Sequence, residues 1–205
     1  DVCSSDLVGS TTVSSGGILQ LLGGATSSGG IASIKSGGMQ QIAGGFTTTN
    51  YIAASGAILG VSSGGVASHT TVSSGSFQYV MSGGAAGTTF VSNGGTEIVY
   101  AGGAASSGSV LSGGIELISS GGTTVSTRVG TGGLEYVLSG AVASASVVSA
   151  SATEYVSSGG LTKSLLLLGS AVISSGGTAS AALIASGGVL QLLGGALLSG
   201  NTTII

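Results

Sequence analysis

A repeat of 19 residues runs through most of this 205-residue chain and constrains its fold more than any other feature. The four glutamates of the chain, Glu97, Glu116, Glu135 and Glu154, lie 19 residues apart. A pair of small residues opens each unit, and a second pair follows seven or eight residues later. The opening pairs begin at Gly16, Gly37, Gly56, Gly75, Gly94, Gly113, Gly132, Ser151, Gly169 and Gly187. Because glycine permits positive φ, each unit is predicted to be strand, turn, strand, turn.

Stacking is the way in which such short units can form a core. A unit of this length cannot bury its own apolar side chains, but stacked units pair each strand with its equivalents above and below. We therefore predict an all-β fold, a parallel β-solenoid of about ten coils and on the order of 50 Å long at roughly 4.8 Å per coil. Helix is disfavoured, since each interior glycine costs about 1 kcal/mol relative to alanine.

The repeat also sets the expected domain boundaries. Residues 8–205 form the repeat domain, whereas residues 1–7 do not fit the repeat and contain Cys3 and both aspartates. We interpret residues 1–7 as an assembly scar. The repeat still runs at Ile205, so the chain is expected to be a fragment of a longer one.

Two columns of the longer segment are predicted to face inward. The first column lies three residues before each opening pair and is apolar: Val13, Ile34, Ala53, Val72, Val91, Val110, Val129, Val148, Leu166 and Ile184. The second lies two residues earlier and is mostly small: Thr11, Ala32, Tyr51, Thr70, Thr89, Gly108, Thr127, Ser146, Ser164 and Ala182. Asn50, His69, Arg128 and Lys163 fall in the columns between, so they are predicted to point outward.

The shorter segment is harder to orient because Glu97 and Val99 are two residues apart, and strict alternation would put both on one face. Four stacked carboxylates inside would repel one another with no cation to balance them. The glutamates are therefore predicted to lie outside. A bulge after the glycine pair would then turn another column inward, namely Val80, Val99, Ile118, Val137 and Val156.

Composition excludes several classes of protein. Disorder is excluded because 42% of the residues are hydrophobic, mean hydropathy is +0.67 and the net charge is only −3. Collagen is excluded because the chain has no proline. The longest run of large apolar residues, Leu165 to Leu168, is too short for a membrane span. Three basic residues cannot neutralise a row of phosphates, so nucleic acid is not an expected partner.

The chain offers few groups for chemistry. It has one histidine, His69, and one cysteine, Cys3, which can form no internal disulfide. The glycine pairs lack the helix and lysine of a phosphate loop and the aspartates of calcium-binding nonapeptides. We therefore expect no catalytic residue, no cofactor and no metal site. Cation binding by the column of glutamates is kept as the weaker alternative to a solvated column.

The units resemble a known family. A unit such as Val61 to Val80, VSSGGVASHTTVSSGSFQYV, is similar to the passenger repeats of AIDA-type autotransporter adhesins of Gram-negative bacteria. The resemblance rests on the period, the SSGG turns and the Q/E-x-V and T-x-V signatures, with Gln40, Gln78 and Gln191 where other units have Glu. It implies a right-handed β-helix, exported through a C-terminal outer-membrane barrel outside this segment and displayed on the cell surface.

The same resemblance implies function and partners. It implies adhesion, self-association or biofilm formation, with copies of the chain on neighbouring cells or host glycans and proteins as partners. The small inventory of chemical groups and the short apolar runs separately predict no enzymatic activity and no membrane insertion by this segment. Some members carry heptose on passenger Ser and Thr, and the expected acceptors here are outward hydroxyls: Thr12, Thr71, Thr88, Ser107, Ser109 and Ser126.

A second function stays open. A free-standing solenoid could bind ice or carbohydrate through regularly spaced threonines. The pairs Thr70–Thr71, Thr88–Thr89 and Thr123–Thr124 favour this alternative, although the pairs do not persist in the later units.

Overall fold

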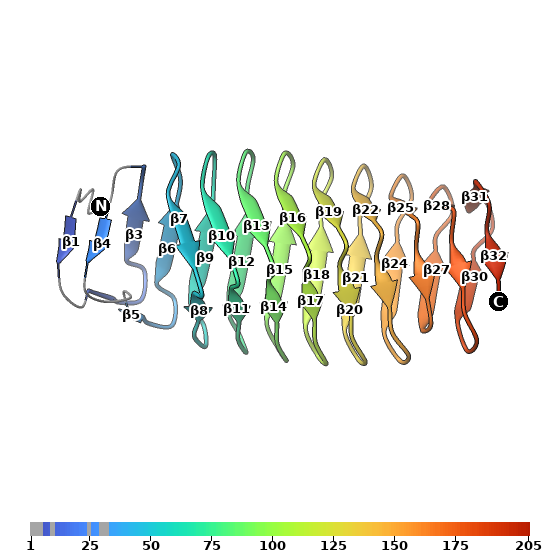
Figure 1. Cartoon of the computed structure of the whole chain (residues 1–205), viewed down its shortest axis with the longest axis horizontal. Coiled ribbons are helices and arrows are strands. Elements are labelled where there is room, and N and C mark those ends of the chain that lie inside the picture. Colours follow the sequence, from blue (N-terminus) through green and yellow to red (C-terminus); the bar gives the residue numbers. More distant parts are fainter. Residues whose placement is uncertain (1–5, 9–10, 24–25, 29–32) are drawn as a thin grey trace.

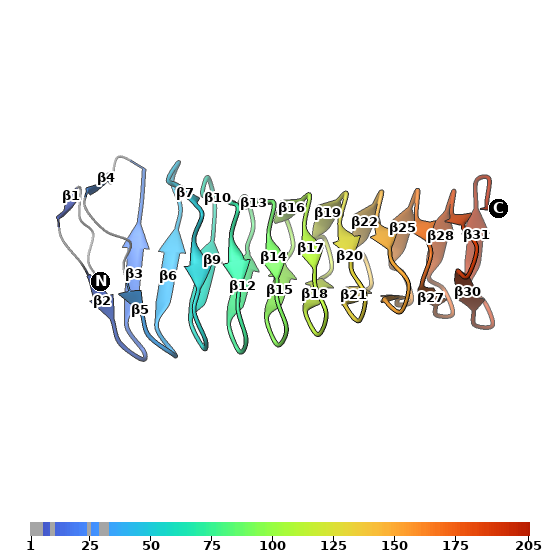
Figure 2. The same ribbon diagram turned by 60° about the horizontal axis from the view of Figure 1, so that its bottom comes forward.

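The protein is an elongated stack of parallel β-coils, as the computed structural model shows (Figures 1 and 2). The structure describes residues 6–8, 11–23, 26–28 and 33–205. These residues form strands and turns without a helix, and they make about ten coils, which confirms the predicted β-solenoid. Within the described residues there is accordingly no helix long and apolar enough to cross a membrane.

Three parallel sheets run along the stack, one strand of each per coil, where the sequence predicted two segments per unit. Sheet I contains β3 (Ile18–Leu21), β6 (Met39–Ile42), β9 (Ile58–Val61), β12 (Phe77–Val80), β15 (Thr96–Val99), β18 (Ile115–Ile118), β21 (Leu134–Val137), β24 (Thr153–Val156), β27 (Ser170–Ile173) and β30 (Val189–Leu192). Sheet II contains β7 (Thr47–Thr49), β10 (Val66–Ser68), β13 (Ala85–Gly87), β16 (Ala104–Ser106), β19 (Thr123–Val125), β22 (Val142–Ser144), β25 (Leu161–Lys163), β28 (Thr178–Ser180) and β31 (Leu197–Ser199). Sheet III contains β8 (Ile52–Ala53), β11 (Thr71–Val72), β14 (Phe90–Val91), β17 (Ser109–Val110), β20 (Arg128–Val129), β23 (Val147–Val148), β26 (Leu166–Leu167), β29 (Leu183–Ile184) and β32 (Thr203–Ile204).

Two shorter pairings lie in the N-terminal part of the chain. Strand β1 (Asp6–Val8) pairs with β4 (Thr26–Ser28), and β2 (Thr12–Val13) pairs with β5 (Ser33–Ile34). Part of the segment assigned to the assembly scar, Asp6 and Leu7, therefore lies in a parallel strand, whereas residues 1–5, Cys3 included, lie outside the described residues.

The two glycines of a pair are needed for different reasons. Gly94 has φ of 72°, the left-handed region that a turn of this kind requires. Gly95 is needed because a Cβ there would clash with the carbonyl oxygen of Val72 in the preceding coil. The turns therefore let successive backbones approach closely enough to pair.

A corner in left-handed conformation separates sheet II from sheet III in each described coil from β7 to β29. The residues at this corner have φ between 52° and 60°: Asn50, His69, Thr88, Ser107, Ser126, Ala145, Ser164 and Ala181. The corner divides the longer segment into two strands, and it shifts the alternation by one residue. Ala67 as well as Thr70 and Val72 therefore points inward in the coil of His69.

Most of the predicted inward columns are confirmed. In the first column the described members other than Leu166 are buried, and in the column of sheet I all five, from Val80 to Val156, are completely buried. Leu166 and Ser164 were predicted to be inward and are not: Leu165 and Leu167 are buried in their place. The turn between β26 and β27 is two residues shorter than the turn between β23 and β24, so the register of that coil shifts.

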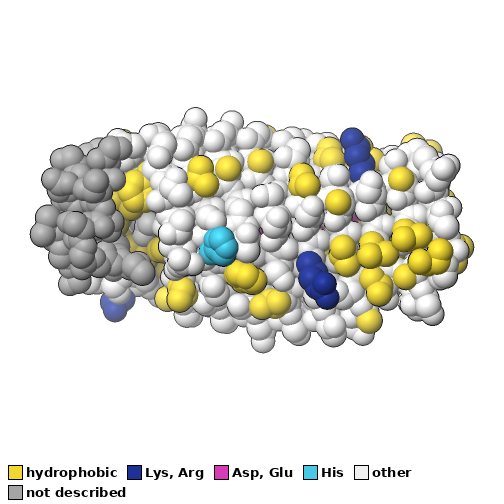
Figure 3. Space-filling view, viewed as in Figure 1, with side chains coloured by type: hydrophobic (Ala, Val, Ile, Leu, Met, Phe, Trp, Pro, Cys, Tyr) yellow, Lys and Arg dark blue, Asp and Glu magenta, His cyan; other side chains and the backbone are white. Residues whose placement is uncertain are grey.

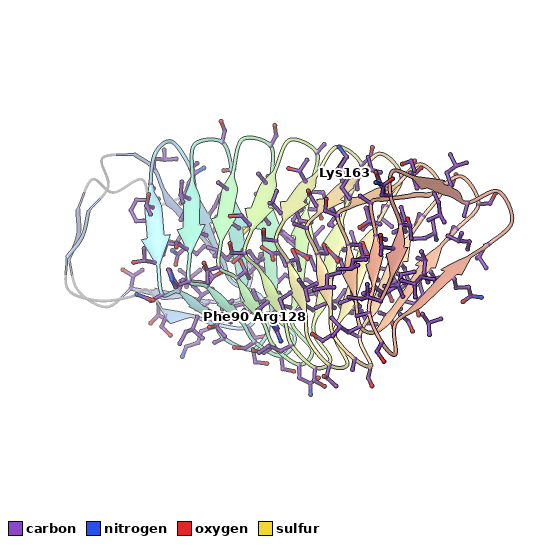
Figure 4. All side chains as sticks on the ribbon, turned by 45° about the vertical axis from the view of Figure 1, so that its right-hand side comes forward. Phe90, Arg128 and Lys163 are labelled. Carbon is purple, nitrogen blue, oxygen red and sulfur yellow. The ribbon has the colours of Figure 1, made fainter. Side chains whose placement is uncertain are left out.

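Three further predictions concern polar residues. Asn50, His69, Arg128 and Lys163 are exposed, as predicted, and Figure 4 shows Arg128 and Lys163 on different sides of the stack. The prediction for the glutamates was wrong, because Glu97, Glu116, Glu135 and Glu154 have no exposed surface and no bulge interrupts their strands. The second inward column is confirmed for Tyr51, Thr70, Thr89, Gly108, Thr127, Ser146 and Ala182, whereas Thr11 is half-buried and Ala32 lies outside the described residues.

Candidate functional site

The most unusual cluster in the described residues is the interior column of glutamates in sheet I. Each glutamate is the second residue of its strand, and Glu97, Glu116, Glu135 and Glu154 stand directly opposite one another in successive coils. Strict alternation places them inside together with the valine or isoleucine two residues later. The whole column reads Leu19, Gln40, Leu59, Gln78, Glu97, Glu116, Glu135, Glu154, Ala171 and Leu190. Gln191 is therefore not part of it, since this residue lies in the outward column next to Leu190.

One end of the glutamate column is well hydrogen-bonded. Thr70 Oγ1 donates to Gln78 Oε1 at 2.6 Å, and Gln78 Nε2 donates to Glu97 Oε1 at 2.8 Å. Thr89 Oγ1 donates to the same Glu97 oxygen at 3.1 Å. The hydroxyls of Thr70 and Thr89 lie directly before strands β11 and β14 of sheet III. Their column faces sheet I across the interior.

The remaining carboxyl oxygens have fewer partners. Ser146 Oγ donates to Glu135 Oε1 at 3.3 Å. Both oxygens of Glu116 and of Glu154 are buried without a hydrogen bond that meets normal geometry, as is one oxygen each of Glu97 and Glu135. A carboxylate in such surroundings would be poorly stabilised, because burial removes its hydration and nothing replaces it.

Burial accordingly raises the pKa of every glutamate in the column. The loss of solvation raises the pKa of Glu97 and of Glu154 from 4.5 to about 7. Burial, together with the charge of Glu97, raises the pKa of Glu116 to about 8. Burial and the charges of Glu154 and Glu116 raise the pKa of Glu135 well above 4.5. These shifts favour the neutral acid, which can donate a hydrogen bond as well as accept one.

No cationic side chain among the described residues could neutralise a negative charge on the glutamates. Lys35, His69, Arg128 and Lys163 are all exposed, so none of them faces the glutamates. Within the described part of the chain no group of three or more His, Cys, Asp or Glu is arranged to hold a metal ion. The raised pKa values favour the neutral form of the glutamates, and a neutral acid can be buried without the cation that the sequence argument required.

A missing side chain leaves space beside the middle of the column. Gly108 occupies the position that Thr89 and Thr127 hold in the neighbouring coils. A Cβ at Gly108 would lie 3.7 Å from Glu116 Oε1, 3.7 Å from Thr127 Oγ1 and 4.0 Å from Glu97 Oε2. All three oxygens are buried without a hydrogen-bond partner. The column of hydroxyls that serves Glu97 is thus interrupted where Glu116 would need it.

We expect Gly108→Thr to stabilise the protein by about 1 to 2 kcal/mol. The new hydroxyl would supply a buried hydrogen bond, and the loss of glycine would reduce the freedom of the unfolded chain. Denaturant unfolding measures the change. Gly108→Ala is the matched control, because alanine also reduces the freedom of the unfolded chain but supplies no hydroxyl. Equal stability of the threonine and alanine variants would show that the glutamates do not lack a donor there.

The other sequence candidates lie apart from this column. His69 is exposed at the corner, where its Nδ1 lies 2.9 Å from Ser68 Oγ, and it has no acidic neighbour recorded among the described residues. Of the expected glycan acceptors, Thr12, Ser107 and Ser126 are exposed and Thr71, Thr88 and Ser109 are half-buried. Thr88, Ser107 and Ser126 lie in the corner column, so their hydroxyls follow one edge of the stack at intervals of one coil.

The threonine pairs do not form an outward rank. Thr70, Thr89 and Thr124 are buried, while their partners Thr71, Thr88 and Thr123 are at the surface. Each pair therefore presents one hydroxyl outside, and the outward members come from different columns.

Comparison with known proteins gives one structural relative of note. No family model matches the chain, and no curated protein matches it by sequence. Among solved structures, the chain is similar to a crystal structure of a hyper-glycosylated fragment of TibA, residues 55–350, whose glycosylation is catalysed by TibC. The two share 30% sequence identity with a TM-score of 0.61, over 94% of this chain and 85% of the TibA chain.

Proposed function

The chain belongs with the autotransporter-adhesin-like β-helices, and we propose that it is a cell-surface passenger segment that acts by adhesion and self-association rather than by catalysis. The observation that carries the proposal is the stack itself: about ten coils in continuous register, similar to the TibA adhesin fragment over 94% of the chain. Such a rod presents the same surface again in every coil, so weak contacts made by each coil add along its length.

The outer surface supports this mode of action. Figure 3 shows basic side chains as isolated points on one face, amid uncharged polar and apolar surface. The four glutamates, which are most of the acidic residues of the chain, are inside. Little long-range repulsion therefore keeps two copies apart.

Glycosylation forms part of the proposal. The TibA fragment is described as hyper-glycosylated, and this chain carries hydroxyls along the corner between sheets II and III. We infer that the exposed members Ser107 and Ser126, and the exposed Thr12, are the first acceptors, ahead of the half-buried Thr71, Thr88 and Ser109. Glycan there would cover one edge of the rod and leave the flat faces free.

The test is to display the chain on bacterial cells at matched levels with different numbers of coils. We expect cells to settle faster as the number of coils rises, because contacts add coil by coil. Cells that display the membrane anchor alone provide the baseline, and each chain is tested with and without the glycosylating enzyme. Settling that does not depend on the presence of the coils would contradict the proposed function.

A further inference from the structure

The outer face of sheet I carries no charged residue over its whole length. Two outward columns form it, and nearly all their members are half-buried or exposed. The first column is Ile18, Met39, Ile58, Phe77, Thr96, Ile115, Leu134, Thr153, Ser170 and Val189; the second is Gln20, Gln41, Gly60, Tyr79, Ile98, Leu117, Tyr136, Tyr155, Val172 and Gln191. We refer to these two columns as the sheet I face. Large apolar and aromatic side chains dominate its middle, from β9 to β24.

Aromatic side chains extend across neighbouring coils on this face. The rings of Phe77 and Tyr79 lie 5.8 Å apart, and those of Tyr79 and Tyr100 lie 5.9 Å apart at the edge of the face. The rings of Tyr136 and Tyr155 stack at 5.2 Å with an angle of 12° between their planes. Rings on this face therefore contact one another both within a coil and between neighbouring coils.

The one glycine of the sheet I face does not leave a hole. A Cβ at Gly60 would clash with the terminal methyl of Met39 and would lie 3.1 Å from that of Met81. The two methionines thus fold over the glycine from the coils on either side, and the apolar surface continues through β9.

The other two sheets are unlike this one. Sheet III carries Arg128 and the exposed Phe90, which Figure 4 shows on the same side of the rod, and strand β25 of sheet II ends in Lys163. Polar residues such as Thr71 and Ser109 alternate with apolar ones such as Val147 in the outward column of sheet III. Sheet I is therefore the face that could be buried without the desolvation of any charged side chain.

We propose that the sheet I face pairs with the sheet I face of a second copy of this chain. The inference rests on the proposed self-association and names the surface that makes it. Two such faces would pack as sheets do, about 10 Å apart, with the side chains of one copy between those of the other.

A second copy of the chain is favoured over other partners because it has the same spacing between successive coils. Coils repeat at roughly 4.8 Å along the rod, and a partner can fill the grooves over the whole length only if it has the same repeat. A face of ten strands, each four residues wide, covers roughly 600 Å², so two copies would bury roughly 1,200 Å², the lower end of the range for specific interfaces. Absence of charge on both copies means that no ion has to be desolvated.

Two matched lysine variants test the proposal. One places lysine on the sheet I face in alternate coils, Tyr79→Lys, Leu117→Lys and Tyr155→Lys. The other places lysine on sheet III in the same alternation, Thr71→Lys, Ser109→Lys and Val147→Lys. All six positions point outward, so the core is unchanged in both. Purified proteins are compared by sedimentation, and displayed proteins by cell settling.

We expect the sheet I variant alone to stay dispersed. Facing lysines would repel across the pair, and a loss of 1.4 kcal/mol already corresponds to a tenfold weaker association, so the variant should need at least roughly ten times the parent concentration to associate. The sheet III variant should associate and settle like the parent. If the lysine variant of sheet I unfolds, Tyr79→Gln, Tyr136→Gln and Tyr155→Gln replace it, because glutamine already occupies this column at Gln20 and Gln41.

The outcomes separate the two proposals. If parent cells settle and the sheet I variants settle equally fast, pairing through this face is wrong while self-association stands. If purified parent pairs through the face but parent cells do not settle, the pairing stands and the proposed function is wrong. If the purified parent stays monomeric while the sheet I variants lose binding to host-cell glycans, the face binds a different partner and the second copy is wrong.

Discussion

Raising the pH from about 4.5 to about 8 is expected to destabilise this protein, whereas most proteins lose stability when their carboxylates are protonated at low pH. The cause is the interior column of Glu97, Glu116, Glu135 and Glu154, each of which is fully buried. Burial raises the pKa of these four acids, so the folded state holds protons that the unfolded state releases.

The sign and the pH range follow from the two states. In the unfolded chain the acids ionise near pH 4.5, while in the folded protein the pKa values are about 7 for Glu97 and Glu154 and about 8 for Glu116. Below 4.5 both states are neutral and stability is complete. As the pH rises toward 8 the unfolded state is progressively favoured, because each pKa unit of difference between the two states corresponds to about 1.4 kcal/mol.

Thermal or denaturant unfolding at a series of pH values measures this effect. A variant with all four glutamates replaced by glutamine is the control, because Gln40 and Gln78 already occupy the same column in the interior. We expect the parent to lose stability across the range and the glutamine variant to change little. A parent profile as flat as that of the variant would mean that the column is not held in its neutral form.

The same column shows where sequence reasoning failed. The alternation of glutamate with valine or isoleucine in β15, β18, β21 and β24 favoured an inward position, and so did the glutamines at Gln40 and Gln78. The outward prediction came from treating each glutamate as a carboxylate, for which burial without a cation would be prohibitive. A carboxyl group whose pKa is raised is neutral instead, so the desolvation cost becomes that of a hydrogen-bonding polar group and the hydroxyls of Thr89 and Ser146 reduce it.

Apolar columns were predictable because period-two alternation depends only on the sequence. The corner between sheets II and III was not predictable in the same way. Residues such as Thr88 and Ala145 adopt positive φ there, although neither residue type favours it. Stacking on the coils before and after imposes the conformation, since every coil must turn at the same place for its strands to pair. That constraint exists only once the coils are stacked.

The coil that ends at Gly169 illustrates a similar limit to sequence alignment. Its glycine was aligned with the glycines that open other units, which predicted Leu166 inside. A Cβ at Gly169 would clash with the carbonyl oxygen of Ser149, so glycine is needed here for a short, tight turn. The shorter turn moves the strand by one residue, and a shift of one residue exchanges the inner and outer faces of a strand.

Val110→Asp is expected to cause the largest loss of stability of any single substitution considered for this protein. Val110 is 1% exposed and stands between Val91 and Val129 in sheet III. An aspartate there would be buried without a partner, and a loss of at least about 3 kcal/mol is expected. Ser109→Asp is the matched control, since the adjacent side chain points outward and is only half-buried. Thermal unfolding of the two variants and the parent gives the comparison.

The contrast with the glutamate column explains why one interior accepts acids at one position and not at another. Glu97 faces hydroxyls of Thr89 and an amide of Gln78, so a neutral acid finds partners. Val110 belongs to an apolar cluster with Val99 and Val129, in which even a protonated aspartate would leave both its oxygens without a hydrogen bond. The loss in Val110→Asp should therefore persist at low pH, where the glutamate column is fully neutral. Equal midpoints for Val110→Asp and the parent would overturn the inward position of this column and, with it, the register on which the fold depends.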